Sequence, residues 1–380
     1  MIIGYDAKRA VSNMTGLGNY SRFVIDSMSR EYPDNEYRLY APKLKENPRL
    51  APLLGRGDVK LCLPECGAGK RLGSLWRSGW GLTEQLRRDN VALYHGLSNE
   101  LPLNIRKSGA ASVVTIHDLI YRRVPEDYTA IDRKLYDYKY GSSARNATRV
   151  IAISERTRAD LISDYDIDPD KIDVIYQGCD DVFTSPISMA DLLAVKEKFD
   201  LPERFIAGVG TVQSRKNQLL TVKALRGLPA DVKLVIVGRR IKDYARKIDD
   251  YVASGGLGDR VIWVSGASLK ELAAIYTLAT FSSYPSRYEG FGIPVIESIN
   301  CGTPVIAATG SCLEEAGGPG ALYVDPDDVD QFVSCANNLL DDTALCDKMT
   351  AAGREYVKRF NNADFARLTM ASYQRALGCV

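Results

Sequence analysis

The chain has 380 residues, with 49 Lys or Arg against 48 Asp or Glu, so its formal net charge at pH 7 is +1. This balance argues against a global field that recruits nucleic acid, and no apolar run reaches the roughly 18 residues that a membrane span needs. An apolar fraction of 45% is ordinary for a globular protein. The start at Met1 lacks the basic and apolar regions of a secretory signal and is typical of a first strand, which favours a cytoplasmic protein.

Short apolar runs alternate with helical patterns along the whole chain, which predicts an α/β fold with parallel sheets covered on both faces. In the first half we expect strands at 1–5, 37–41, 91–95, 112–116 and 149–153 and helices at 19–31, 128–146 and 155–165. In the second half we expect strands at 205–209, 233–237, 261–264, 280–283, 304–307 and 322–324 and helices at 219–226, 242–254, 269–278, 294–301, 329–341 and 343–360. The repeated scheme predicts two Rossmann-like domains that join near 182–202, with ligands bound at strand carboxyl ends in an interdomain cleft.

The segment from Tyr284 to Val305 carries the clearest chemical signal. Glu289 and Glu297 stand eight positions apart, separated by a glycine-bracketed turn and the start of a helix. A helix start offers free N–H groups to an anion, and a glutamate one turn further on can accept hydrogen bonds from hydroxyls. The segment therefore predicts a site for a ligand that is part phosphate and part polyol.

Three further turns follow strands and are weaker signals. Gly16 and Gly18 lie in a loop between the first strand and the first helix, where backbone amides can meet a phosphate or an acceptor. His117 ends another strand, where it either contacts substrate or, as is more common for a single histidine, serves packing. Arg215 and Lys216 follow the first strand of the second half, either paired with a diphosphate or exposed in an ordinary loop.

Two more loops, after the strands at 233–237 and 261–264, can offer backbone groups to a nucleobase. The candidate residues of these two loops are Gly238, Ala267, Ser268 and Leu269.

The cysteines do not indicate a metal site. Cys62 and Cys66 are the only close pair among eight, and the chain has two histidines, so we expect reduced thiols and no metal site.

Taken together, these segments resemble the nucleotide-sugar glycosyltransferases of family 4, which retain anomeric configuration and have the two-domain GT-B fold. The resemblance covers nearly the whole chain, and the Glu-x(7)-Glu pattern in its Gly-Phe-Gly context is its most specific part. The other markers are Gly16–Tyr20, His117–Leu119, Ile153–Glu155, Tyr176–Gly178, Arg215–Asn217, Tyr288–Gly292, Cys301–Val305 and Leu313–Glu315.

The resemblance implies a role for each matched residue. Glu297 looks like the glutamate that binds the ribose of the nucleotide, and Glu289 like the one beside the transferred sugar. Lys216, with Arg215 beside it, looks like the lysine that neutralises the departing diphosphate, and His117 like a histidine near the donor sugar. The glycine loop at Gly16 would approach phosphate and acceptor. The backbone amides expected to contact sugar and diphosphate are those of Gly290, Phe291, Gly292 and Ile293.

One position departs from the family pattern. Many members carry an arginine directly after the strand glycine, whereas this chain has Thr211, so either Arg215 supplies the second cation or the site has one charge fewer. By resemblance, the domains are 1–183 and 184–362, and the terminal segment 363–380 crosses back onto the first domain. The resemblance also implies retention, with the departing phosphate assisting same-face attack, and no metal or other cofactor.

The resulting hypothesis is a retaining enzyme that moves a hexose such as mannose or glucose from a GDP- or UDP-sugar to a saccharide or lipid-linked acceptor. Lipopolysaccharide or capsule synthesis is the expected setting, and no nucleic-acid partner is expected. The basic and aromatic segment from Lys70 to Trp80 either contacts the inner membrane at its cytoplasmic face or is a solvated helix with buried tryptophans. The alternatives are a GT-B nucleotide-sugar epimerase or phosphorylase, and a non-catalytic donor-binding subunit.

Overall fold

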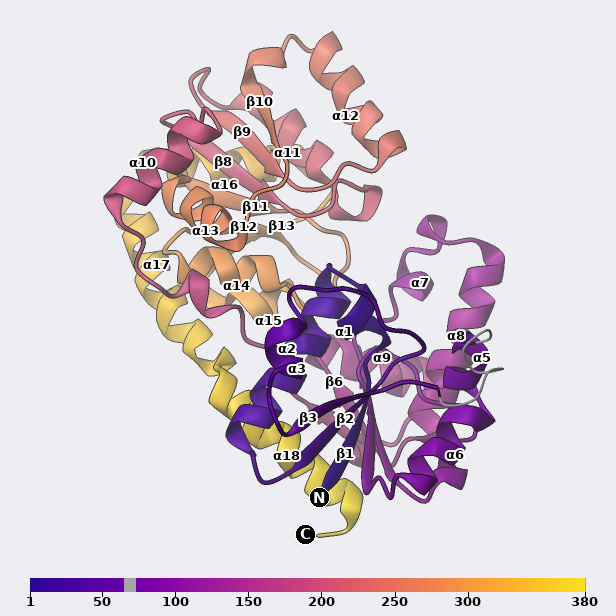
Figure 1. Cartoon of the computed structure of the whole chain (residues 1–380). Helices are drawn as coiled ribbons and strands as arrows, with labels where there is room; N and C mark the ends of the chain where they lie inside the picture. The colour runs from indigo at the N-terminus through magenta and orange to yellow at the C-terminus, as the bar shows by residue number, and fades with distance from the viewer. Residues whose placement is uncertain (65–72, 380) are drawn as a thin grey trace. The chain divides into compact units, whose positions relative to one another are not determined.

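The computed structural model describes residues 1–64 and 73–379, and the chain divides into two compact units (Figure 1). Unit 1 comprises Met1–Gln177 together with the chain from Asn362 onward, and unit 2 comprises Gly178–Asn361. The division falls before the expected position at 183, because the ring of Phe183 packs in the core of unit 2, 6.2 Å from that of Tyr276. None of the described helices is both long and apolar enough to cross a bilayer.

Unit 1 is built on a seven-stranded, fully parallel sheet with the order β3-β2-β1-β4-β5-β6-β7. The five expected strands are present within one or two residues, and the short strands β3 and β7 at the sheet edges were not predicted. The strands are β1 (Ile2–Asp6), β2 (Glu36–Tyr40), β3 (Val59–Cys62), β4 (Leu93–Gly96), β5 (Ala111–Ile116), β6 (Arg149–Ala152) and β7 (Ile172–Val174).

The helices of unit 1 cover both faces of this sheet. The first long helix begins at Gly16 rather than after Gly18 as expected, so Gly18 lies inside it. The C-terminal helix packs on it, with the ring of Phe365 4.8 Å from that of Phe23, and Figure 1 shows the two helices side by side. The helices are α1 (Lys8–Ser12), α2 (Gly16–Glu31), α3 (Ala51–Leu54), α5 (Gly73–Ser78), α6 (Trp80–Arg88), α7 (Ile120–Arg123), α8 (Ala130–Asn146), α9 (Glu155–Tyr165) and α18 (Asn362–Leu377).

Unit 2 has a six-stranded parallel sheet with the order β10-β9-β8-β11-β12-β13. Its strands were all predicted, three of them with the bounds observed. They are β8 (Phe205–Val209), β9 (Lys233–Val237), β10 (Val261–Val264), β11 (Phe281–Tyr284), β12 (Val305–Ala308) and β13 (Ala321–Val324). The helices are α10 (Met189–Lys198), α11 (Gln218–Ala224), α12 (Lys242–Ser254), α13 (Leu269–Leu278), α14 (Ile293–Asn300), α15 (Leu313–Gly317), α16 (Val329–Asp341) and α17 (Thr343–Val357).

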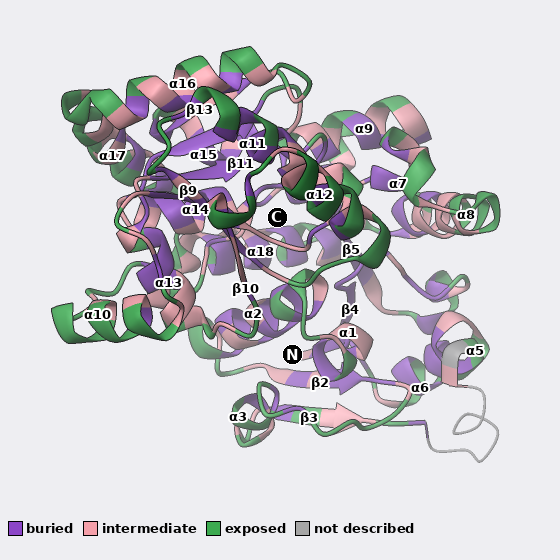
Figure 2. Cartoon of the chain, turned by 90° about the horizontal axis from the view of Figure 1, so that it is seen from above, coloured by how far each residue is buried: buried purple, intermediate pink, exposed green. Residues whose placement is uncertain are grey.

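The sheet of unit 2 is buried on both faces, as its continuous apolar strands predict. Along β8, Ile206 enters one core cluster, whereas Phe205 and Ala207 enter the other, because successive side chains of a strand point to opposite faces. Helices bury their inner faces on these clusters and leave their outer turns exposed (Figure 2). The strand order runs outward in two directions from the pair β8 and β11, so the loops after these two strands diverge and leave room for a ligand.

Candidate active site

The two loops that follow β8 and β11 bring together three charged side chains. Arg215 Nη1 and Lys216 Nζ each lie 2.6 Å from Glu289 Oε1. Lys216 ends a single 3-10 turn after β8, and Glu289 lies in the loop between β11 and α14. Because β8 and β11 are neighbours at the point where strand order reverses, the cluster occupies the position where doubly wound sheets bind ligands.

Neighbouring groups hold this cluster in place. Ser286 Oγ donates a hydrogen bond to Glu289 Oε1 at 2.5 Å, and Arg215 Nη1 donates to the Tyr288 carbonyl at 2.5 Å. Lys216 donates to the hydroxyl of Tyr284, and its ammonium lies 4.6 Å from the centroid of that ring. The loop after β8 is also tied to the loop after β11, since Arg287 N donates to the Arg215 carbonyl at 2.9 Å. The two cations are therefore fixed before any ligand arrives.

The charges of the cluster depend on one another. Burial by itself raises the pKa of Glu289, but the charges of Lys216 and Arg215 outweigh it and lower that pKa to about 2. Burial lowers the pKa of Lys216, and the Glu289 carboxylate opposes that shift. Two cations share one anion, so the cluster retains a net charge of +1 toward a ligand.

Glu297 lies in the second turn of α14 and is half-buried. The N-cap of this helix is Gly292, whose φ of +114° is left-handed and whose added Cβ would lie 2.7 Å from a methyl group of Leu313. A side chain at this position would be strained and crowded, which explains the glycine. The cap residue has no side chain to block the free N–H groups of the first turn.

The environment of Glu297 is opposite to that of Glu289. Burial and the nearby carboxylate of Asp180 raise the pKa of Glu297 to about 8, with Tyr276 and Lys216 acting against them. The carboxyl group is therefore neutral near pH 7, and a neutral carboxyl both donates and accepts hydrogen bonds. Such a group suits a pair of hydroxyls.

The loops after β8 and β9 pack against each other through two glycines. The backbone of Gly238, whose φ is +152°, lies close to that of Gly210. A Cβ added to Gly238 would lie 2.1 Å from the Gly210 carbonyl oxygen. Thr211 follows, half-buried, and its carbonyl accepts a hydrogen bond from Gln218 Nε2 at 3.1 Å. The position of Thr211 carries no charge, and the cation that lies beside Lys216 on Glu289 is Arg215.

Three other predicted donor residues lie farther along the same sheet edge. Ala267, Ser268 and Leu269 follow β10, two strands away from β8. Ser268 is the N-cap of α13: its hydroxyl accepts from Glu271 N, and the Glu271 carboxylate accepts from Ser268 N. No recorded contact among the described residues joins these three to the charged cluster.

In unit 1 the structure joins two other predicted elements. His117, at the carboxyl end of β5, lies 4.5 Å from the ring of Tyr20 in the glycine loop helix, with the rings edge to face. His117 Nε2 is 2.9 Å from the Leu97 carbonyl, which fixes the proton on Nε2 and leaves Nδ1 as an acceptor. Burial lowers its pKa to about 4, so the ring is neutral at pH 7.

The two glycines of that loop differ in their surroundings. An added Cβ on Gly18 would lie 1.9 Å from the Asn13 carbonyl oxygen, so this glycine is required for packing between α1 and α2. Gly16 is exposed, with nothing within 4 Å of an added Cβ, so space remains there for a ligand.

The remaining contacts of the Gly-Phe-Gly turn hold its backbone in place. The Phe291 ring is buried and lies 5.2 Å from that of Phe360, so the ring belongs to the core of unit 2. Cys312 Sγ donates to the Glu289 and Phe291 carbonyls at 3.1 and 3.0 Å. Ile293 is the first residue of α14, at the end that offers free amides.

Sequence reasoning missed four residues around the glutamates: Tyr284, Ser286, Tyr276 and Asp180. Two of them, Tyr284 and Ser286, stand inside the motif segment, where a polar residue just before Glu289 is a usable signal. Asp180 and Tyr276 are distant from Glu297 in sequence, and no local pattern points to them. Among the described residues, no group of three or more His, Cys, Asp or Glu side chains could hold a metal ion.

Comparison with protein-family models identifies both halves of the chain. Residues 23–183 match Glycosyltransferase Family 4, and residues 191–356 match Glycosyl transferases group 1. With its two parallel-sheet domains, the protein is a glycosyltransferase of the GT-B fold. The chain belongs to glycosyltransferase family 4.

Individual proteins show the same likeness. The O-antigen chain mannosyltransferase B of Escherichia coli is 28% identical, in an alignment that covers 95% of this chain and 96% of that protein. The structure of sucrose-phosphate synthase from Thermosynechococcus elongatus is similar over 100% of both chains, with a TM-score of 0.79 and 20% identity. The structure of Anabaena HepE with UDP and glucose is similar over 98% of both chains, with a TM-score of 0.75 and 17% identity.

Proposed function

We propose that this glycosyltransferase moves a hexose, mannose or glucose in the first instance, from a GDP- or UDP-sugar to a saccharide or lipid-linked saccharide. The proposed setting is synthesis of a surface polysaccharide, lipopolysaccharide or capsule, in the cytoplasm at the inner face of the membrane. The observation that carries the proposal is the cluster of Arg215, Lys216 and Glu289 at the reversal point of the sheet. The mannosyltransferase relative in E. coli supports a hexose, and the HepE complex supports a nucleotide sugar.

The proposed reaction breaks the bond between sugar and diphosphate. Negative charge grows on the departing diphosphate, and Lys216 and Arg215 are held where they can stabilise it without reorganising. Glu297 both accepts hydrogen bonds from the ribose hydroxyls and donates to them. Glu289 is ionised and accepts hydrogen bonds from hydroxyls of the transferred sugar. Because two side-chain cations and the amides of α14 provide the positive charge, the proposal includes no metal or other cofactor.

We further propose that the reaction retains anomeric configuration. Glu289 is ionised and already paired with two cations, so it does not resemble the proton-donating member of a glycosidase carboxylate pair. As the resemblance to family 4 implies, the proposal gives the departing phosphate oxygen the role of base for the acceptor hydroxyl. The epimerase, phosphorylase and donor-binding alternatives use the same donor site and differ in their products.

A panel of GDP-, UDP-, ADP- and CMP-sugars tests the proposal in two steps. Thermal shift identifies the base and sugar that stabilise the protein, because a bound ligand raises stability by mass action. Release of nucleoside diphosphate from that donor, measured without and with saccharide acceptors, then detects catalysis. We expect slow release alone and faster release with an acceptor. Binding of a donor with no release under either condition would contradict the transferase, and release of an isomerised nucleotide sugar would favour an epimerase.

A further inference from the structure

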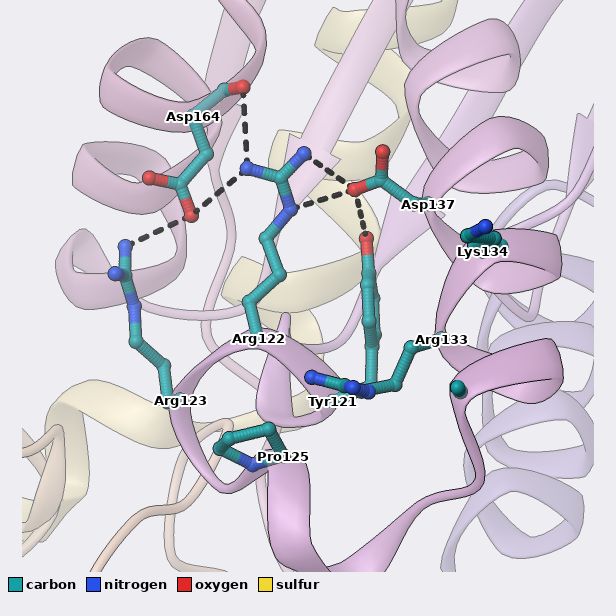
Figure 3. Close-up of a pocket in the computed structure, with 9 residues that line it drawn as sticks. Tyr121, Arg122, Arg123, Pro125, Arg133, Lys134, Asp137 and Asp164 are labelled. Atoms are coloured by element: carbon teal, nitrogen blue, oxygen red, sulfur yellow. Dashed lines mark hydrogen bonds and ion pairs between the residues drawn. The ribbon is translucent and has the colours of Figure 1, made fainter.

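Unit 1 contains a cavity of about 560 Å³ between α7, α8 and α9 that the proposed reaction does not use (Figure 3). Cations outnumber anions in its lining, four against two. The charged lining residues are Arg122, Arg123, Arg133, Lys134, Asp137 and Asp164. The cavity therefore favours an anion.

Two of the four cations form the wall of the cavity. Arg122 Nε lies 2.6 Å from Asp137 Oδ1, and Arg123 Nη2 lies 2.9 Å from Asp164 Oδ2 (Figure 3). Arg133 and Lys134 are exposed on α8, and within residues 1–64 and 73–379 neither has a recorded ion pair. These two cations remain available to a ligand.

The helix that carries them also exposes an apolar stripe. Ile131, Leu135 and Tyr138 are exposed by 79%, 44% and 60%. Their spacing of four and three residues places them along one face of α8, next to the face that lines the cavity. Single exposed apolar side chains need no explanation, but a stripe bordered by cations is typical of a helix that lies in a bilayer interface.

The segment expected to contact a membrane, Lys70–Trp80, fits that role less well. Lys70, Arg71 and Leu72 lie outside the described residues. Trp76 is buried, and Arg77 is buried in ion pairs with Asp6, at 2.6 Å, and with Glu100. Only Leu75 and Trp80 expose large apolar surface in the described part of this segment.

We propose that unit 1 binds an anionic phospholipid bilayer through α8. A lipid phosphate enters the cavity beside Arg133 and Lys134, and Ile131, Leu135 and Tyr138 enter the bilayer interface. The inference deepens the proposed function, on which its purpose rests, since it would bring the protein to a lipid-linked acceptor. The bilayer is favoured over a free anion because the apolar stripe borders the cavity.

The test is co-sedimentation of the whole protein with vesicles of phosphatidylcholine alone or mixed with phosphatidylglycerol. The wild type should bind the anionic vesicles, and added salt should weaken that binding because it screens the attraction. Arg133→Gln/Lys134→Gln should lower the partition coefficient about thirty-fold. Ile131→Ser/Leu135→Ser should lower it about tenfold or more.

Unit 2 offers a matched control for each variant. Arg246 and Lys247 are an adjacent, exposed Arg-Lys pair on α12. Met189 and Leu193 are exposed by 69% and 58% on α10 with the same spacing of four as the apolar pair of α8. Arg246→Gln/Lys247→Gln and Met189→Ser/Leu193→Ser should leave vesicle binding unchanged.

Several outcomes would overturn the proposal: equal loss in the α8 variants and their controls, equal binding to neutral and anionic vesicles, or no binding to either. If inorganic phosphate binds in the cavity but vesicles do not bind to the protein, the cavity is a site for a soluble anion instead. Nucleoside diphosphate release is measured on the same samples. Since α8 is outside the donor site, that activity should persist in the variants, so failure of bilayer binding and failure of the transferase reaction appear separately.

Discussion

Replacing Glu297 with glutamine removes a half-buried carboxyl group whose pKa the fold raises from 4.5 to about 8. Between pH 4.5 and about pH 8, Glu297 is ionised in the unfolded chain and neutral in the folded protein, so the folded state binds more protons. The contribution of Glu297 to stability is therefore fully present below pH 4.5 and is lost as pH rises through 8. Glutamine has nearly the same shape and does not titrate, so the variant should escape this loss.

The size of the effect follows from the same interval. Each pH unit in which only the unfolded state is ionised costs about 1.4 kcal/mol, which over the interval from 4.5 to 8 accumulates to about 5 kcal/mol. Because Glu297 is half-buried, solvent screens part of this penalty, and we expect about 2–4 kcal/mol. For a unit of this size that corresponds to about 4–16 °C in the unfolding temperature.

The assay is urea and thermal unfolding of the wild type and of Glu297→Gln at about pH 5 and about pH 9. The difference between the two proteins at each pH cancels the titration of all other groups. Glu289→Gln is the control, because the pKa of Glu289 is about 2 and its cost should be equal at both pH values. A difference between wild type and Glu297→Gln that stays constant from about pH 5 to about pH 9 would show an ionised Glu297 and refute the reasoning.

Nucleotide binding to variants of Glu297 distinguishes the effect of its charge from the effect of its hydrogen bonds. If the neutral carboxyl binds the ribose, Glu297→Gln should keep the affinity near pH 7 to within about tenfold, because an amide also donates and accepts. Glu297→Ala should lose about tenfold more, since it leaves the hydroxyls without partners. Calorimetry with nucleoside diphosphate distinguishes the two, and equal losses would assign the ribose contact to a carboxylate.

Three other predictions concern the donor site and its supports. Lys216→Ala should lower the rate of nucleoside diphosphate release about 100- to 1,000-fold at saturating donor, and near-native turnover would remove Lys216 from the mechanism. Since the pKa of His117 is about 4, the wild-type rate should show no inflection from His117 between about pH 5.5 and 8; an inflection there that disappears in His117→Ala would contradict a neutral, buried ring. Gly238→Ala should cost about 1–3 kcal/mol of unfolding free energy because the new Cβ would meet the Gly210 carbonyl; Gly258→Ala, where nothing lies within 4 Å, is the control, and similar losses in both would show that the close approach is not the cause.

The fold was predictable because the apolar pattern is strong wherever both faces of a strand are buried. The strand at Phe205–Val209 and the helices at Lys242–Ser254 and Leu269–Leu278 have the predicted bounds. The strands at Val59–Cys62 and Ile172–Val174 were missed because they are short and lie at sheet edges, where partial exposure weakens the pattern.

The candidate site was predictable in its residues and not in its electrostatics. The order of the motifs and the parallel sheet place Lys216 and Glu289 at one edge, because neighbouring strands end there. The contacts that set the pKa values of the two glutamates were not predictable as a set. Tyr284 and Ser286 are local to the motif, but Asp180 reaches Glu297 only through the packing of unit 2. A raised or lowered pKa depends on burial and on distant charges, which a local pattern does not contain.

The opposite protonation of the two glutamates has a consequence for an anionic ligand. Glu289 holds Arg215 and Lys216 in position but cancels one of their two charges. If Glu297 were also ionised, these four side chains would have no net charge, and a diphosphate would gain little by entering. With the pKa of Glu297 at about 8, they carry a net charge of +1 near pH 7. Burial of Glu297 thus favours a ligand that presents hydroxyls to α14 and phosphates to Lys216, at the expense of stability at high pH.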